Sequence, residues 1–289
     1  MLGQFVINGL ISGILYSLLA IGFALVYNTT KVFHIAAAAI YVFAAYIFYL
    51  FAVTFGSPII VSALIAILLT MGLSLLTDVS VYRPLKNREA SNNVAMVASI
   101  GMMTVIVNLL AMIFGNETKM IDNATHHLFS LGDAIITTPQ MWQLVVGIII
   151  IIIFFLFIAK TPWGIRLRAL SSDSVLYETL GYNTSHTRIF VFLLSGAFIA
   201  ISSCLAAYDT GLNPHMGMNV IINAMVAMII GGMGRLGTCV LGGITLGLLQ
   251  GITAYKFSEN WLNAATFVLL LTLLFIRPQG IAGYKQRNV

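Results

Sequence analysis

Charged residues are scarce in this chain: Asp, Glu, Lys and Arg make up 8% of its 289 residues, whereas 60% are hydrophobic. The mean hydropathy is +0.99, and apolar stretches recur along the whole length. A soluble domain has about a quarter of its residues charged, so this composition excludes that class and predicts an integral membrane protein. Apolar runs such as residues 147–159 do not alternate with polar residues, which favours helices over a β-barrel.

Cysteine and nucleotide-binding loops are also lacking. Cys204 and Cys239 both fall in apolar runs, so the sequence predicts small buried side chains and neither a disulfide framework nor a metal site. The G-x-x-x-x-G-K-[ST] loop that binds nucleotide phosphates is absent, which excludes an ATPase site of that type. We therefore expect this chain to hold no catalytic residue, no metal and no cofactor of its own.

Ionisable groups are missing from the predicted spans as well. Nine apolar segments can be drawn, at residues 5–27, 32–53, 58–77, 94–114, 141–159, 189–208, 216–234, 236–255 and 260–276. With these boundaries no charged residue lies well inside a span, which disfavours a proton-coupled carrier or pump and leaves open a sodium site made of carbonyls and hydroxyls. The sequence predicts one all-α transmembrane domain, residues 1–289, with about eight or nine segments. The small-residue segments 32–53, 216–234 and 236–255 are the candidates for broken or re-entrant spans.

The basic residues indicate how these segments are oriented. An N-terminus on the outside places 12 of the 14 Lys and Arg residues inside and leaves only Lys119 and Lys256 outside. The inside residues are Lys31, Arg83, Lys86, Arg88, Lys160, Arg166, Arg168, Arg188, Arg235, Arg277, Lys285 and Arg287. We expect a C-terminus on the inside, an outside loop at 115–140 and an inside segment at 160–188. The net charge of +5 reports this topology and does not indicate nucleic-acid binding.

A few polar side chains within the apolar segments are candidates for a translocation path. Ser12 and Tyr16 lie four residues apart and share one helix face. Such residues either form interhelical hydrogen bonds or line a path. The candidate path residues are Ser12, Tyr16, Asn28, His34, Asn108 and Asn223.

Glycine is concentrated late in the chain. Gly243, Gly247 and Gly251 recur every four residues, which predicts a smooth helix face that another backbone approaches closely. The run IIGGMGRLG predicts a tight turn or a break, because each glycine in a helix costs about 1 kcal/mol relative to alanine. Close packing and a moving gate are both open as roles of this group: Gly231, Gly232, Gly234 and Gly237.

The inside segment is unusually polar for this chain. Pro162 and Gly164 are expected to break the preceding span, Asp173 to cap a short helix, and Gly181 to end it. Leu176 and Leu180 stand at i and i+4 and would form an apolar ridge. Such a helix suits docking into a groove of a partner, and the alternative is an amphipathic helix on membrane lipid.

Five stretches carry a family resemblance, in order along the chain. They are V-Y-R-P-L at 81–85, S-I-G-M at 99–102, G-I-R-L-R-A-L-S-S-D-S-V-L-Y-E-T-L-G-Y-N at 164–183, I-G-G-M-G-R-L-G at 230–237 and R-P-Q-G-I at 277–281. Together they resemble the ABC-transporter permeases for branched-chain amino acids, over essentially the whole chain. The resemblance implies a multi-pass protein of a bacterial-type inner membrane that moves branched-chain amino acids or a related small solute by alternating access.

The resemblance also implies partners. These are two cytoplasmic ABC ATPases that bind ATP and Mg²⁺, a second permease subunit that is homologous or identical, and a periplasmic solute-binding protein. It assigns Arg168, Ala169, Asp173 and Gly181 to a coupling segment that meets an ATPase. Leu176, Glu178 and Leu180 of the same helix complete the candidate coupling set.

One stretch departs from the family. Where the family usually shows Asn-Phe-Ala-His-Gly-Glu, this chain has His34, Ile35 and the alanines of 36–39. The polar His and Glu positions are therefore Ala37 and Ala39, and a family permease for urea or short-chain amides stays open as an alternative. An ion-coupled secondary carrier and a structural membrane scaffold also stay open.

Overall fold

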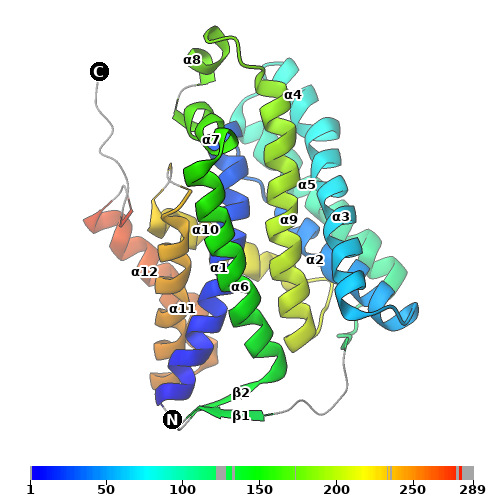
Figure 1. The fold of residues 1–289 in the computed structure, drawn as a ribbon, viewed down its shortest axis with the longest axis vertical. Coiled ribbons are helices and arrows are strands. Elements are labelled where there is room, and N and C mark those ends of the chain that lie inside the picture. The colour runs from blue at the N-terminus through cyan, green and yellow to red at the C-terminus, as the bar shows by residue number, and fades with distance from the viewer. Residues whose placement is uncertain are drawn as a thin grey trace. The chain divides into compact units, whose positions relative to one another are not determined.

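A computed structural model describes residues 2–121, 128–131, 134–172, 174–232, 234, 236–277 and 280–281. Helices make up most of it (Figure 1). The elements are α1 (Leu2–Thr30), α2 (Ala37–Tyr49), the π-helix η1 (Leu50–Thr54), α3 (Ile59–Thr77), the π-helix η2 (Asp78–Tyr82), α4 (Arg83–Asn87), α5 (Asn92–Phe114), β1 (Leu128–Leu131), β2 (Ala134–Thr137), α6 (Thr138–Lys160), α7 (Pro162–Ser172), α8 (Ser174–Thr179), α9 (Thr184–Thr210), α10 (Met216–Gly231), α11 (Cys239–Lys256), the 3-10 helix η3 (Glu259–Trp261) and α12 (Leu262–Ile276).

The predicted all-helical membrane fold is confirmed, because all nine apolar segments fall on helices. Within the described residues, six helical stretches are long and apolar enough to cross a membrane: Gly3–Thr30, Ala37–Thr54, Ile59–Asn87, Asn92–Phe114, Thr138–Lys160 and Thr184–Thr210. The last three segments correspond to α10, α11 and α12, with 16, 18 and 15 residues. At about 1.5 Å per residue these helices are shorter than a hydrocarbon core of roughly 30 Å.

The predicted outside loop contains a short hairpin that the sequence did not indicate. Strands β1 and β2 pair antiparallel, with Leu128 opposite Thr137. The Gln4 side chain joins the hairpin: its Oε1 accepts from the Ile135 N–H at 2.7 Å and its Nε2 donates to the Ile135 carbonyl at 2.9 Å. One amide side chain thus satisfies both backbone groups of an exposed strand residue.

The chain folds into two compact units, each assembled from distant parts of the sequence. Unit 1 comprises Met1–Ala24, Ala124–Phe155 and Ile222–Val289. Unit 2 comprises Leu25–Asn123 and Leu156–Ile221.

In unit 1, the first part of α1 packs closely against α11. The predicted smooth glycine face of α11 is confirmed, and it meets glycines of α1. A Cβ on Gly9 would lie 2.6 Å from the Gly247 carbonyl oxygen, and a Cβ on Gly247 would overlap the Gly9 carbonyl. The Ser17 hydroxyl lies 2.6 Å from the Gly13 carbonyl oxygen and 3.0 Å from that of Val240 on α11. Small residues on both helices allow this approach, as is typical of membrane helix pairs.

In unit 2, helices α2, α3, α5 and α9 pack around a buried core. The close packing of α3 against α9 depends on Gly196, since a Cβ there would lie 2.8 Å from Ser74 Cβ. The Ser74 hydroxyl donates to the Phe192 carbonyl at 2.8 Å, which ties α3 to α9 at the same place. One buried cluster of this core comprises Ala39, Val42, Ala45, Tyr46, Ile106, Leu110, Ala207 and Leu212.

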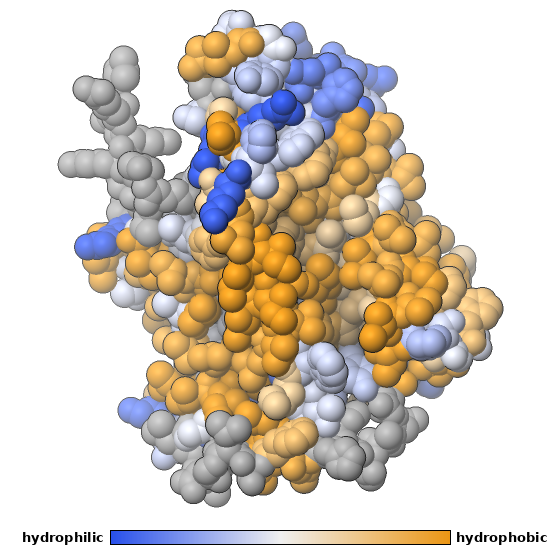
Figure 2. All heavy atoms as spheres, viewed as in Figure 1, coloured by the Kyte–Doolittle hydropathy of each residue, from blue (hydrophilic) through white to orange (hydrophobic). Residues whose placement is uncertain are grey.

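The outward faces of α3 and α6 are apolar, as Figure 2 shows. Ile60 and Leu68 on α3 are 76% and 66% exposed, and Ile153 on α6 is 58% exposed. Apolar surface of this extent is expected where helices contact lipid. Cys204 and Cys239 are both buried, as predicted.

Candidate functional site

The break after α6 lies where the sequence predicted it. Helix α6 ends at Lys160, and α7 begins at Pro162. Proline suits the first position of a helix, because the N–H that it lacks has no partner within the helix there. The Thr161 hydroxyl accepts from the Gly164 N–H at 3.2 Å and caps the new helix. Gly164 lies inside α7, where a Cβ would overlap the Ile158 carbonyl. The segment 160–188 therefore holds two helices, α7 and α8, and the sequence predicted only the second.

Helix α8 ends at Thr179, and Gly181 just beyond it is the helix stop that the sequence predicted. The Gly181 N–H donates to the Glu178 carbonyl at 2.9 Å and the Tyr182 N–H to the Tyr177 carbonyl at 3.4 Å. Gly181 has φ +84, and the rings of Tyr177 and Tyr182 stack with centroids 5.1 Å apart. This is a Schellman motif with its apolar contact, a strong helix stop. Asp173, predicted to cap the start of the helix, lies outside the described residues.

The candidate coupling residues of this segment point outward. Arg168, Ala169 and Glu178 are exposed. The ridge leucines Leu176 and Leu180 are 57% and 65% exposed. Figure 2 shows apolar side chains at the tip formed by α8, next to hydrophilic ones.

The segment is anchored to the start of α9. The Tyr177 hydroxyl is buried and lies 2.9 Å from Thr187 Oγ1. The Asn183 side chain caps α9 by accepting from the N–H groups of Ser185 and His186, at 2.9 and 3.3 Å. Helix α8 is thus held by a buried hydrogen bond while its ridge remains exposed.

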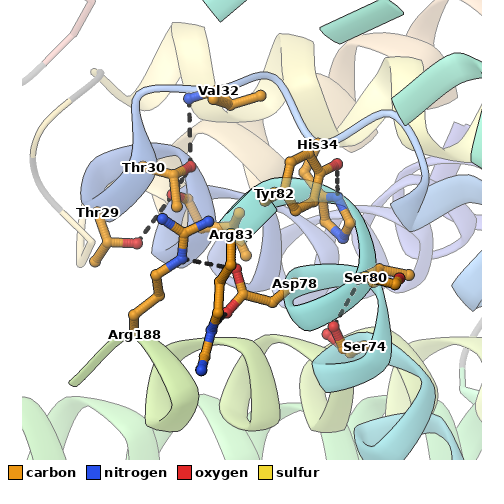
Figure 3. A network of polar contacts seen from close by, with 12 residues as sticks. Thr29, Thr30, Val32, His34, Ser74, Asp78, Ser80, Tyr82, Arg83 and Arg188 are labelled. Carbon is orange, nitrogen blue, oxygen red and sulfur yellow. Dashed lines mark hydrogen bonds and ion pairs between the residues drawn. The ribbon is translucent and has the colours of Figure 1, made fainter. Parts of the chain in front are cut away.

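A polar cluster that sequence reasoning missed lies beside this anchor (Figure 3). Asp78 follows directly after the predicted third span, and its side chain is fully buried. Its Oδ1 accepts from Arg188 Nε at 2.7 Å and its Oδ2 from Arg83 Nε at 2.9 Å. Nearby, the buried His34 Nδ1 lies 2.6 Å from the Tyr82 hydroxyl. One feature of the sequence could have indicated this cluster: Asp78 stands at the edge of a span, and a carboxylate that becomes buried there needs a positively charged partner.

In unit 1, the structure brings two candidate path residues together. Asn223 Nδ2 donates to the Tyr16 hydroxyl at 3.3 Å. Two further residues that the sequence did not single out extend the chain: Gln250 Nε2 donates to Asn223 Oδ1 at 3.3 Å and to Thr266 Oγ1 at 2.9 Å. Ser12, one turn before Tyr16, is half-buried. This network links α1, α10, α11 and α12 through groups that could exchange partners with a polar solute.

In unit 2, the remaining path candidates lie apart. Asn28 is buried, and neither atom of its amide has a hydrogen-bond partner among the residues the structure describes. Asn108 is exposed and donates to the Thr104 carbonyl at 2.7 Å. It lines a cavity of about 160 Å³ together with Ala38 and His215. A translocation path lined by the six residues stays a prediction.

The glycines at 231–237 form the turn between α10 and α11. Gly232 and Gly234 have φ +112 and +116, which only glycine adopts without strain. A Cβ on Gly231 would overlap the Thr238 carbonyl, and one on Gly237 would lie 2.8 Å from the Phe155 ring. The predicted tight turn is confirmed, and close packing accounts for the other two positions. A moving gate stays a prediction.

A bundle of apolar helices that carries buried polar networks and an exposed, capped helix pair is the architecture of a multi-pass helical membrane protein. The family described as "Branched-chain amino acid transport system / permease component" matches residues 5–277. The chain belongs to this family, which confirms the resemblance predicted from its motifs. It is a multi-pass inner-membrane permease subunit and is not itself catalytic.

The curated relatives are similar over nearly their whole length. BraD, the high-affinity branched-chain amino acid transport system permease protein of Pseudomonas aeruginosa, is 27% identical over 97% of this chain and 95% of its own. LivH of Escherichia coli K12, named for the same system, is 24% identical with the same coverage. The probable LivH of Methanocaldococcus jannaschii is 26% identical over 92% of this chain and 88% of its own.

A solved structure shares the fold. The structure "PsaBC from Streptococcus pneumoniae in complex with Fab" has a TM-score of 0.51 and 14% sequence identity, and the match covers 95% of this chain and 92% of the other. At this identity the likeness concerns the fold alone.

Proposed function

We propose that this chain moves branched-chain amino acids across the inner membrane by alternating access, as the permease subunit of an ATP-driven ABC importer. The observation that carries the proposal is the family match over residues 5–277. Relatives that cover nearly the whole chain are named for high-affinity branched-chain amino acid transport. These names favour this substrate class over urea, short-chain amides or an ion-coupled carrier.

The energy for import would come from partner subunits. The proposed complex contains two cytoplasmic ATPases that bind ATP and Mg²⁺, a second permease subunit and a periplasmic solute-binding protein. The N-terminus would lie outside and the C-terminus in the cytoplasm, which the distribution of 12 of the 14 basic residues supports. In this orientation the segment 160–188 faces the ATPases.

The ridge on α8 is the proposed contact with an ATPase. Leu176 and Leu180 are more than half exposed on a helix that is capped and anchored through Tyr177. Burying a leucine contributes roughly 1.5–3 kcal/mol, so burying the exposed parts of both would contribute roughly 2–3 kcal/mol to docking. A helix already fixed in place has little conformational entropy to lose on binding.

The alanines that replace the family's polar His and Glu lie in an apolar environment. Ala37 and Ala39 are fully buried, and Ala39 belongs to the core of unit 2. Ala38, between them, lines the cavity of about 160 Å³ near Asn108. We infer that this small, mostly apolar cavity supports passage of an aliphatic side chain better than that of urea.

Reconstituted transport tests the proposal. The chain is co-purified from its host, and a Walker-motif ATPase is expected in the complex; the complex is then placed in proteoliposomes with the solute-binding protein. ATP-driven leucine uptake should fall about tenfold or more in the double variant Leu176→Ser, Leu180→Ser, since the ridge contributes roughly 2–3 kcal/mol to docking and about 1.4 kcal/mol is a tenfold change. The control is Ile165→Ser, which removes an apolar side chain that is 61% exposed on the neighbouring helix α7. Full uptake in the ridge variant would refute the coupling role, and uptake of urea in place of leucine would refute the substrate.

A further inference from the structure

A second cavity, of about 240 Å³, lies in unit 2 where α1 ends and α5 and α9 begin. Three basic side chains line it: Lys31, Lys86 and Arg188. No carboxylate is among its described lining residues. Asp78 is fully buried and engaged by two arginines, and the exposed Glu89 of the neighbouring loop does not line the cavity. Glu178 does not line it either, but its Oε1 accepts from the hydroxyl of the lining residue Thr184 at 2.9 Å. The lining therefore carries three positive side chains, and among the described residues only Arg188 is ion-paired, with the Asp78 carboxylate that it shares with Arg83.

Arg188 presents its guanidinium to this cavity from a fixed position. Its side chain is 12% exposed, and Asp78 engages its Nε at 2.7 Å. Figure 3 shows the outer end of the guanidinium on the side of Thr29 and Thr30, which also line the cavity. Arg83 and Arg188 each bind the Asp78 carboxylate through Nε. Because one negative charge is shared between two positive ones, the cluster has a net positive charge. A planar guanidinium held in this way suits oxyanion recognition.

The two lysines are not neutralised by carboxylates in the part of the chain described. The Lys31 amino group lies 3.4 Å from the Ser171 carbonyl oxygen. Partial removal from water lowers the pKa of Lys31, because no nearby negative charge offsets the loss of hydration. Lys86 is exposed on α4, and no ion pair joins it to a described residue. Both amino groups are thus available to a ligand.

Two helix starts complete the lining. Asn92 and Thr184 are the first residues of α5 and α9, and both line the cavity. The start of each helix carries a partial positive charge. Caps occupy some of the first N–H groups, since Ser91 accepts from Val94 and Asn183 from Ser185 and His186. The cavity is smaller than the roughly 300–1,000 Å³ of sites for drug-sized ligands, which fits a compact anion.

We propose that this cavity binds a phosphate group, either free or carried by the head of an anionic lipid. Three cations and two helix starts converge on it, and phosphate is the compact oxyanion that such a set recognises. The ligand differs from the proposed amino-acid substrate, and the site stands whether or not the chain moves leucine.

Binding to the purified full chain tests the site. The probes are short-chain phosphatidylglycerol, short-chain phosphatidylcholine and inorganic phosphate, titrated at low salt in neutral detergent. The double variant Lys31→Gln, Lys86→Gln should weaken binding of the preferred anionic probe about tenfold, because hydrogen bonds between ionised groups are stronger than those that a neutral amide can make. The control is Arg88→Gln, Lys256→Gln, which removes the same charge at exposed positions outside the cavity and should bind as the wild type does.

The outcomes separate the two sources. Displacement of phosphatidylglycerol by inorganic phosphate assigns a free-phosphate site, whereas lipid binding that phosphate does not displace assigns a lipid head group. Equal weakening in both double variants would mean diffuse surface charge and overturn the proposal, as would binding of neither anionic probe or displacement by leucine alone. Lys86→Arg keeps the charge and should retain binding, which distinguishes removal of a ligand-binding group from misfolding.

Discussion

Replacing Asp78 with asparagine removes the one carboxylate that holds two arginines in unit 2. The Asp78 side chain is fully buried, and those of Arg188 and Arg83 are 12% and 29% exposed. Removing one partner of a buried ion pair costs roughly 3–5 kcal/mol, because the other charge is left without compensation. Since Arg83 is partly in water, we expect Asp78→Asn to lower the free energy of unfolding by about 3 kcal/mol, at the lower end of this range.

The prediction also orders the arginine variants. Arg188→Gln should cost more than Arg83→Gln, because Arg188 is less exposed and lies closer to the carboxylate, at 2.7 against 2.9 Å. The measurement is equilibrium unfolding of the purified chain in mixed micelles. The double variant Asp78→Asn, Arg188→Gln should cost clearly less than the sum of the two single variants. A cost below about 1 kcal/mol for Asp78→Asn, or strictly additive effects, would show that the pair contributes little to the fold.

Three further predictions concern other parts of the fold. Gly247→Val should destabilise the chain by about 2 kcal/mol or more, because its Cβ would overlap the Gly9 carbonyl; Gly72→Ala, with nothing within 4 Å, should be neutral or stabilising in the same thermal melts. Tyr16→Phe should cost about 1 kcal/mol by losing the Asn223 hydrogen bond, and an unchanged melting midpoint would contradict this. Gly181→Ala should lower the stability of α8 by roughly 1 kcal/mol, since φ is +84 there. Hydrogen exchange should show a loss of protection confined to α8, and protection equal to that of the wild type would contradict this.

The helices were predictable because their signal is local. Runs of apolar residues long enough to span a bilayer placed all nine segments, and the spacing of Gly243, Gly247 and Gly251 predicted a face for close approach. The helix end at Gly181 also followed from one residue type and its neighbours. The partner of the glycine face, α1, was not predictable, since spacing within one helix does not identify the helix that it meets.

The polar cluster around Asp78 escaped prediction for the same physical reason. Asp78 and Arg188 are 110 residues apart and meet only when α3 and α9 pack. Asp78 also stands one position beyond the predicted third span, where a charge is usually solvated. In the structure the π-helix η2 continues α3 through this point, so the carboxylate is buried. Likewise, the sequence did not single out Gln250 and Thr266, because the hydrogen bonds of Gln250 to Asn223 and to Thr266 form only in the packed structure.

The ion pair at Asp78 has a mechanical consequence for the helix pair α7–α8. Tyr177 of α8 lies against Thr187 of α9, and Arg188, the next residue, is bound to Asp78 at the end of α3. The exposed ridge is therefore joined to two long helices: two side-chain hydrogen bonds, Tyr177 to Thr187 and Thr184 to Glu178, connect α8 to α9, and one ion pair connects α9 to the end of α3. A chain without this carboxylate would keep the link between α8 and α9 and lose the ion pair that joins α9 to the end of α3.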